Sequence, residues 1–86
     1  MPEISRFPGI SIRMYRDEHL PPHFHAIYNE FAAQISIRHP AVIQGKLPPR
    51  VPGFVMEWAA LHEDDLARCW DVARTDRPIG KIEPLI

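Results

Sequence analysis

The chain has 86 residues, enough for one domain over its whole length (1–86) and too few for two hydrophobic cores. Hydrophobic residues make up 45% and charged residues 24%, which is typical of a globular protein and excludes a disordered chain. The formal net charge of −1 provides no general attraction for nucleic acid, and the single cysteine, Cys69, excludes an internal disulfide and a cysteine zinc site. Because there is neither a membrane-length apolar run nor a secretory signal, we expect a soluble cytoplasmic protein without a membrane partner.

The first half of the chain has the alternation of an antiparallel sheet. Residues 10–16 alternate between apolar and polar side chains, which indicates a half-buried strand. Two further strands are expected at 23–28 and 31–38, joined by a two-residue turn at Asn29-Glu30. A short fourth strand is expected near residues 41–44.

The turn at Asn29-Glu30 fixes which side chains share a face. On the core side, Phe24 lies opposite Ile35. On the other side, His25 lies opposite Gln34, and the same register places His23 opposite Ser36.

Residues 52–74 change to a helical period, with an apolar side that contains Trp58 and Trp70. We predict one continuous helix of roughly 34 Å, with Pro52 in its first turn. The alternative is two helices broken at His62, because the acidic residues 63–65 suit the start of a second helix.

The expected helix also places His62 and Cys69 on its apolar side. We therefore expect His62 to have a structural role beside Asp65, and Cys69 to be an inert packing residue. The segment 81–86 is expected to lie on the core as an extended tail.

The predicted fold is α+β: a small antiparallel three- to four-stranded sheet with one face covered by a single long C-terminal helix. One helix covers only one face, so the other face is left open. The open face is expected to carry no acidic residue and to display Arg13, Tyr15, His23, His25, Gln34, Ser36 and, at its margin, Arg38.

Several short motifs along the chain resemble one family. The motifs are Met-Pro-Glu-Ile-Ser-Arg-Phe at 1–7, Ile-Arg-Met-Tyr at 12–15, Pro-Pro-His-Phe-His at 21–25, Gly-Lys-Leu-Pro at 45–48, Glu-Trp at 57–58, Leu-His at 61–62, the segment 70–73 and Lys-Ile-Glu-Pro-Leu at 81–85. Together they are similar to the prokaryotic domain-of-unknown-function family 4160. The resemblance implies no established activity; it implies a small bacterial protein encoded beside another small protein, in an arrangement like that of toxin–antitoxin pairs.

The segment 17–25 holds the residues best suited to chemistry. On a strand, side chains two residues apart point the same way, so His23 and His25 can bind one divalent transition metal such as zinc. His19 or Asp17, from the preceding loop, can supply a third ligand. The alternative interpretation is a pair of surface histidines beside a proline turn.

A second interpretation needs no metal. His23 and His25 can exchange protons near neutral pH, and Arg13 can stabilise phosphate charge, as in a nuclease-like enzyme acting on RNA.

The interpretation that we favour from the sequence is a protein-binding module of a two-gene, toxin–antitoxin-like system. The open sheet face, with Tyr15, Gln34, Ser36 and Arg38 as binding residues, would then dock a small protein encoded nearby.

Overall fold

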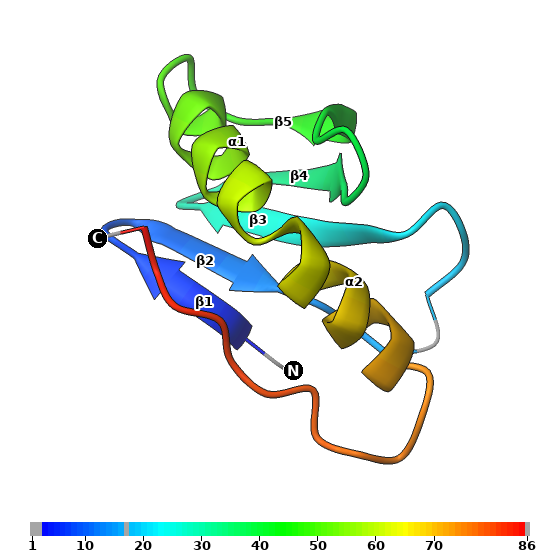
Figure 1. Ribbon diagram of the computed structural model, residues 1–86. Helices are drawn as coiled ribbons and strands as arrows, with labels where there is room; N and C mark the ends of the chain where they lie inside the picture. The colour runs from blue at the N-terminus through cyan, green and yellow to red at the C-terminus, as the bar shows by residue number, and fades with distance from the viewer. Residues whose placement is uncertain (1–2, 17, 86) are drawn as a thin grey trace.

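The computed structural model describes residues 3–16 and 18–85, which form five strands followed by two helices (Figure 1). The strands are β1 (Glu3–Phe7), β2 (Ile10–Arg13), β3 (His23–Tyr28), β4 (Phe31–Ser36) and β5 (Val42–Lys46). The helices are α1 (Val51–Leu61) and α2 (Glu63–Val72). The α+β class is therefore confirmed. Among the described residues, no helix is both long and apolar enough to cross a membrane.

The five strands form one antiparallel sheet in the order β1-β2-β3-β4-β5. The predicted register of β3 and β4 is confirmed, with His25 opposite Gln34 and Phe24 opposite Ile35. Asn29 forms the turn at φ 53°, a left-handed conformation that asparagine tolerates without the usual glycine. The faces of the sheet were thus predicted correctly at its centre.

The prediction of three to four strands is wrong, because β1 was not foreseen. The register of β1 shifts between Glu3 and Ser5, so the neighbouring residues Ile4 and Ser5 are both buried. This irregularity removes the period-two pattern by which a strand is recognised. The strand predicted at 10–16 also ends earlier, at Arg13.

The prediction of one long helix is wrong as well, and the alternative with two helices is right. His62 has φ −123° and ψ 27°, outside the helical region, and separates α1 from α2. Glu63, Asp64 and Asp65 occupy the first turn of α2, where their negative charge interacts favourably with the helix dipole. The two helices follow one another diagonally across the sheet, with the break between them (Figure 1).

Both helices lie on the same face of the sheet and bury its core (Figure 1). Trp58 is fully buried, with its ring 5.7 Å from the rings of Phe7 and Phe24, and its indole nitrogen donates a hydrogen bond to the Glu83 carbonyl (2.7 Å). Trp70 and Cys69 are buried too, as predicted, and burial raises the pKa of the Cys69 thiol.

The C-terminal tail lies along the outer edge of β1. The Ile82 amide donates a hydrogen bond to the Ile4 carbonyl (2.7 Å), and the Ile82 side chain is buried. The expectation of an extended tail on the core is therefore confirmed for the described residues up to Leu85. The tail protects one edge of the sheet, whereas every residue of β5 at the other edge is exposed.

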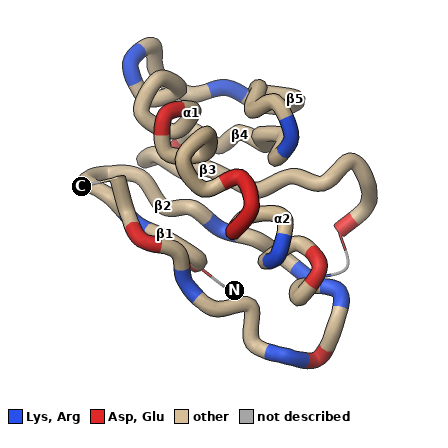
Figure 2. Tube along the Cα trace, viewed as in Figure 1, with Lys and Arg blue, Asp and Glu red and all other residues tan. Residues whose placement is uncertain are grey.

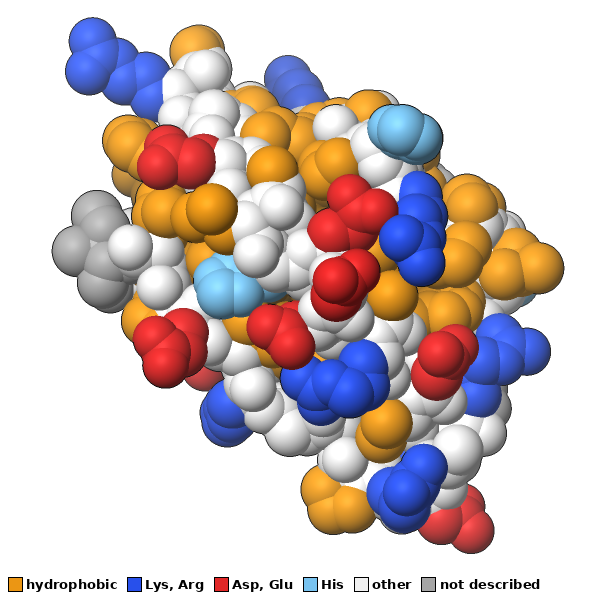
Figure 3. Space-filling view, in the orientation of Figure 1, with side chains coloured by type: hydrophobic (Ala, Val, Ile, Leu, Met, Phe, Trp, Pro, Cys, Tyr) orange, Lys and Arg blue, Asp and Glu red, His pale blue; other side chains and the backbone are white. Residues whose placement is uncertain are grey.

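Charged residues are unevenly divided between the helices (Figure 2). The acidic residues of α2 outnumber its single basic residue, Arg68, while α1 has one charged residue, Glu57. Acidic, basic and hydrophobic side chains are intermixed on the helix-covered side (Figure 3). This side therefore has no extended patch of a single charge.

Two glycines test the packing of the fold. Gly45 has φ 79°, and a Cβ there would lie 2.3 Å from the Ala32 carbonyl oxygen, whereas a Cβ on Gly53 in α1 would meet nothing within 4 Å. We expect Gly45→Ala to lower the free energy of unfolding by about 1–3 kcal/mol, because the strain and the clash add. Gly53→Ala, the matched control, is expected to raise it by about 0.5 kcal/mol. Urea denaturation of both variants measures this, and equal stabilities would contradict the predicted strain at Gly45.

Candidate metal centre

The site is built at the beginning of β3, the central strand of the sheet. His23 and His25 are two residues apart on this strand, so their side chains leave it on the same side. Their rings lie 5.3 Å apart between centroids. His25 is flanked by Arg13 on β2 and Gln34 on β4, its partners in the sheet register.

His23 is held in one orientation by its backbone surroundings. Its Nδ1 lies 2.7 Å from the carbonyl oxygen of Pro21, which can only accept, so Nδ1 donates the hydrogen. The side chain is 2% exposed. Its Nε2 is buried and has no hydrogen-bond partner among the described residues. In this tautomer Nε2 carries a lone pair, which leaves a buried acceptor unsatisfied.

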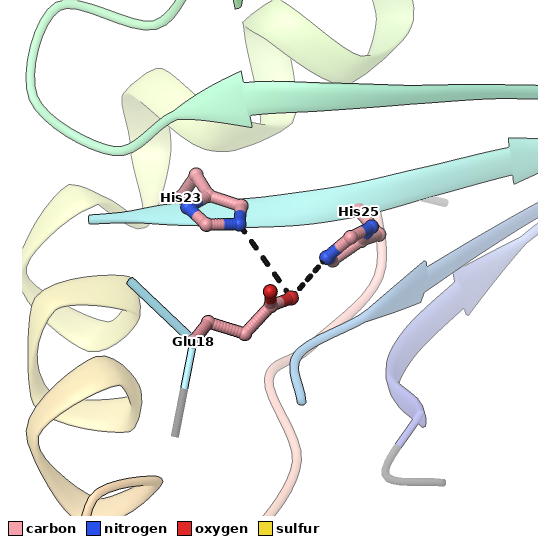
Figure 4. Close-up of side chains that lie close together, drawn as sticks. All are labelled: Glu18, His23 and His25. Carbon is pink, nitrogen blue, oxygen red and sulfur yellow. Dashed lines mark hydrogen bonds and ion pairs between the residues drawn. The ribbon is translucent and has the colours of Figure 1, made fainter. Parts of the chain in front are cut away.

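Glu18, from the loop before β3, reaches both histidines (Figure 4). Its Oε1 lies 3.5 Å from His23 Nε2 and forms a short hydrogen bond with His25 Nε2. The candidate ligand atoms of Glu18, His23 and His25 all lie within 4.8 Å of one another. Glu18 and His25 are about one-fifth exposed, so solvent can reach the cluster past them.

Aromatic rings surround the two imidazoles. The Tyr15 ring meets that of His25 edge-on, with centroids 4.5 Å apart, and the Trp70 ring of α2 lies 5.4 Å from that of His23. We expected both histidines to point away from the tryptophan-bearing helix, and for His23 this is wrong. Trp70 lies on α2, after the break at His62, and its ring covers His23 at the start of β3.

The third residue of the cluster is Glu18, whereas the sequence predicted His19 or Asp17. His23 and His25 do lie together, but His19 is exposed and outside the cluster, and Asp17 lies outside the described residues. Glu18 was not predicted as a ligand. It stands between the two residues that were considered, but no sequence pattern specifies which side chain of an irregular loop turns towards the strand.

Arg13 lies beside His25, and the Nε of its guanidinium is engaged by a hydroxyl on the same strand. Arg13 Nε donates to Ser11 Oγ (3.1 Å), and Ser11 in turn donates to a Glu3 carboxylate oxygen (2.5 Å), which also accepts from Arg6 (2.9 Å). The hydrogen bonds from Ser11 and Arg6 hold the pKa of Glu3 below its usual value. The expectation of an open face without acidic residues is therefore wrong.

The predicted binding residues divide into two pairs. Tyr15 and Gln34 adjoin His25. The Ser36 hydroxyl instead accepts from the Ala41 amide (3.1 Å) and closes the turn after β4. Arg38 lies beyond β4 and pairs with Glu63 of α2 (2.9 Å), so these last two residues are not part of the cluster.

His62 is not part of the cluster and contacts residues of α1 and α2. Its ring lies 5.5 Å from that of Trp58, and its Nδ1 lies 3.5 Å from an Asp65 carboxylate oxygen. These contacts agree with the structural role expected from the sequence.

Two imidazole nitrogens and one carboxylate oxygen form a donor set that suits zinc and other divalent first-row metals. Three protein ligands would leave at least one coordination position for water or substrate. The hydrogen bond from Nδ1 of His23 to a backbone carbonyl is the outer-shell contact that commonly orients a ligating histidine.

Comparison with known proteins adds a family and no activity. No curated protein and no solved structure matches the chain. The family described as "Domain of unknown function (DUF4160)" matches residues 9–71, well over half of the chain and including all three residues of the cluster. On this match, the chain belongs to the DUF4160 family.

Proposed function

We propose that this domain binds one divalent transition metal, such as zinc, through Glu18, His23 and His25. The observation that carries the proposal is the buried, unpartnered Nε2 of His23, which faces the Glu18 carboxylate at 3.5 Å. Since Nδ1 of His23 carries the proton, this contact brings two hydrogen-bond acceptors together. A cation between them would satisfy both.

The separation of Glu18 and His23 favours this occupant. Ligand atoms about 2.1 Å from a tetrahedral zinc ion lie about 3.4 Å apart, close to the separation of Glu18 Oε1 and His23 Nε2 (3.5 Å). A proton on His23 Nε2 would satisfy the same pair, but it would place a buried positive charge on the imidazole. A metal would use all three groups, and the bond between Glu18 and His25 would open to admit it.

The chemistry that fits such a centre is hydrolysis by a metal-bound water. A metal with an open position lowers the pKa of bound water and polarises the bond to be cleaved. Arg13 is the register partner of His25 and uses one of its donors, Nε, for the Ser11 hydroxyl. A nuclease-like reaction on RNA would depend on the metal for its nucleophile, with charge stabilisation from the metal and from Arg13 beside it.

Metal affinity tests the proposal directly. Titration of untagged protein with Zn²⁺ in a calorimeter is expected to give one equivalent of tight binding. His25→Ala and Glu18→Gln are each expected to weaken it by about 100-fold or more, since outer-shell changes alone cost 10- to 100-fold. His19→Ala, which removes an exposed histidine of the same loop, is the matched control and should leave the affinity unchanged. Equal binding by all four proteins would refute the site.

The metal should also stabilise the fold, because His23 is packed into the core against Trp70. A ligand that binds only the native state at 100 times its Kd adds about 2.7 kcal/mol to the free energy of unfolding. We therefore expect Zn²⁺ to raise the thermal midpoint of the wild type and of His19→Ala, and not that of His25→Ala. Calorimetric unfolding scans with Zn²⁺ and with EDTA measure the difference; a rise of the same size in His25→Ala would point to another site.

A second candidate function is recognition of a small protein partner, as in a toxin–antitoxin-like pair. The observation in its favour is edge strand β5, whose residues are all exposed and include Val42 (39% exposed) and Ile43 (44% exposed). An open edge can accept a strand from another chain through main-chain hydrogen bonds.

Coexpression with the product of an adjacent gene tests this second function. We expect a complex that survives gel filtration with the wild type and with His25→Ala, and that is lost in Ile43→Lys, because a lysine on the edge strand opposes strand addition. Retention of the complex by Ile43→Lys would exclude β5 as the interface.

A further inference from the structure

A row of polar side chains crosses the open face of the sheet through His25. The register aligns Glu3, Arg13, His25, Gln34 and Gln44, one residue from each strand. Neighbouring strands lie about 4.8 Å apart, so each side chain in the row adjoins the next. The row is charged at its β1 end and uncharged at its β5 end.

The uncharged end forms a concavity of about 170 Å³. It is lined by His25, Ala32, Ala33, Gln34, Gln44 and Gly45. The strand backbones and small residues leave this space, and Gly45 cannot be replaced freely, because a Cβ there would lie 2.3 Å from the Ala32 carbonyl oxygen. Pockets for drug-sized ligands begin at about 300 Å³, so this one suits a group the size of a single ring.

The residues that line the concavity suit an uncharged, planar ligand. Gln34 and Gln44 present amides that both donate and accept, and no side-chain hydrogen bond within residues 3–16 and 18–85 engages either amide. His25 adds an aromatic ring. Unstacked bases are recognised in this way, by an aromatic ring and by hydrogen bonds to the base edge.

Charge argues against a phosphate group in the concavity. The lining contains no lysine or arginine, and Arg13, on β2, lies outside it and donates from Nε to Ser11. Lys46 lies on β5 outside the lining.

We infer that this concavity binds the base of a pyrimidine nucleoside, with the amides of Gln34 and Gln44 on the base edge and the ring of His25 against the base. Uracil carries an N–H donor between two carbonyl acceptors, which two glutamine amides can pair with together. The inference goes beyond the proposed metal centre and does not depend on it, because only His25 belongs to both.

The experiment is a titration of ¹⁵N-labelled protein with uridine, followed by the backbone amides of residues 32–34 and 44–45. We expect saturable shifts at millimolar uridine, in metal-free and in zinc-loaded protein alike. 3-Methyluridine, which lacks the N3–H donor, should bind about three- to tenfold more weakly, the factor for one neutral hydrogen bond. Ribose 5-phosphate, which lacks the base, should give no shifts at these residues.

Three variants separate the pocket from the general surface. Gln44→Leu is expected to weaken uridine binding by about three- to tenfold, and Ala32→Leu, which fills the concavity from an exposed position, to abolish it. Lys46→Met, the control on the same strand, should bind as the wild type does. The inference is overturned if uridine gives no saturable shifts, if ribose 5-phosphate or acetamide binds as well as uridine, or if Lys46→Met loses binding while Ala32→Leu keeps it.

Because zinc affinity is measured separately, loss of the metal site and loss of the base pocket are distinguishable. Zinc binding without uridine binding would refute only the pocket, and the reverse result would refute only the metal centre.

Discussion

The alternation of β3 is the constraint on which the rest of the molecule depends. This strand is the middle one of five, so it is hydrogen-bonded to a neighbouring strand along each of its two edges. Phe24 packs against Trp58 on the helix-covered face, while His25 points to the opposite face. A shift of the register by one residue would exchange these two side chains, placing an imidazole against Trp58 and a phenyl ring in water. The core and the histidine cluster are thus fixed by the same hydrogen-bonded ladder.

The break at His62 decides how the two histidines differ. In a single straight helix, the twelve residues from Trp58 to Trp70 would turn the second ring about 120° away from the first around the axis. With the break, Trp58 stays over the centre, whereas Trp70 reaches the start of β3 and buries the ring of His23. Burial turns the unsatisfied Nε2 of His23 from an ordinary surface nitrogen into an energetically costly one. Because this nitrogen is buried, its lack of a hydrogen-bond partner supports a bound ligand, such as a metal ion, at the cluster.

Local patterns predicted the central part of the fold well. The hairpin of β3 and β4 was predictable because two alternating runs and a two-residue turn all specify one register. β1 was not predictable, because its irregular pairing near Ile4 hides the alternation, and the helix break was a choice between two readings of residues 63–65. At β1 and at the helix break, the tertiary contacts, and not the local pattern, determined the structure.

The candidate site was predictable to the same extent. The pairing of His23 and His25 was predictable from the sequence alone, because side chains two residues apart on a strand point to the same side. Glu18 did not follow, because an irregular loop has no period that would specify its direction. The acidic residue on this face likewise did not follow, because it depends on β1, which brings Glu3 within reach of Ser11.

The arrangement of charge across the open face links the two proposals. At the β1 side, Glu3 pairs with Arg6, while Arg13 keeps its charge and donates from Nε to the Ser11 hydroxyl. At the β5 side, the concavity is lined by two amides, small residues and the ring of His25. A negatively charged ligand would be drawn to this face by Arg13 and by a metal at Glu18, His23 and His25, and a neutral ring would be favoured in the concavity beside them. A substrate that satisfies both conditions has an anionic or polarisable group and an uncharged base a few ångströms apart, which is the chemistry of a nucleotide.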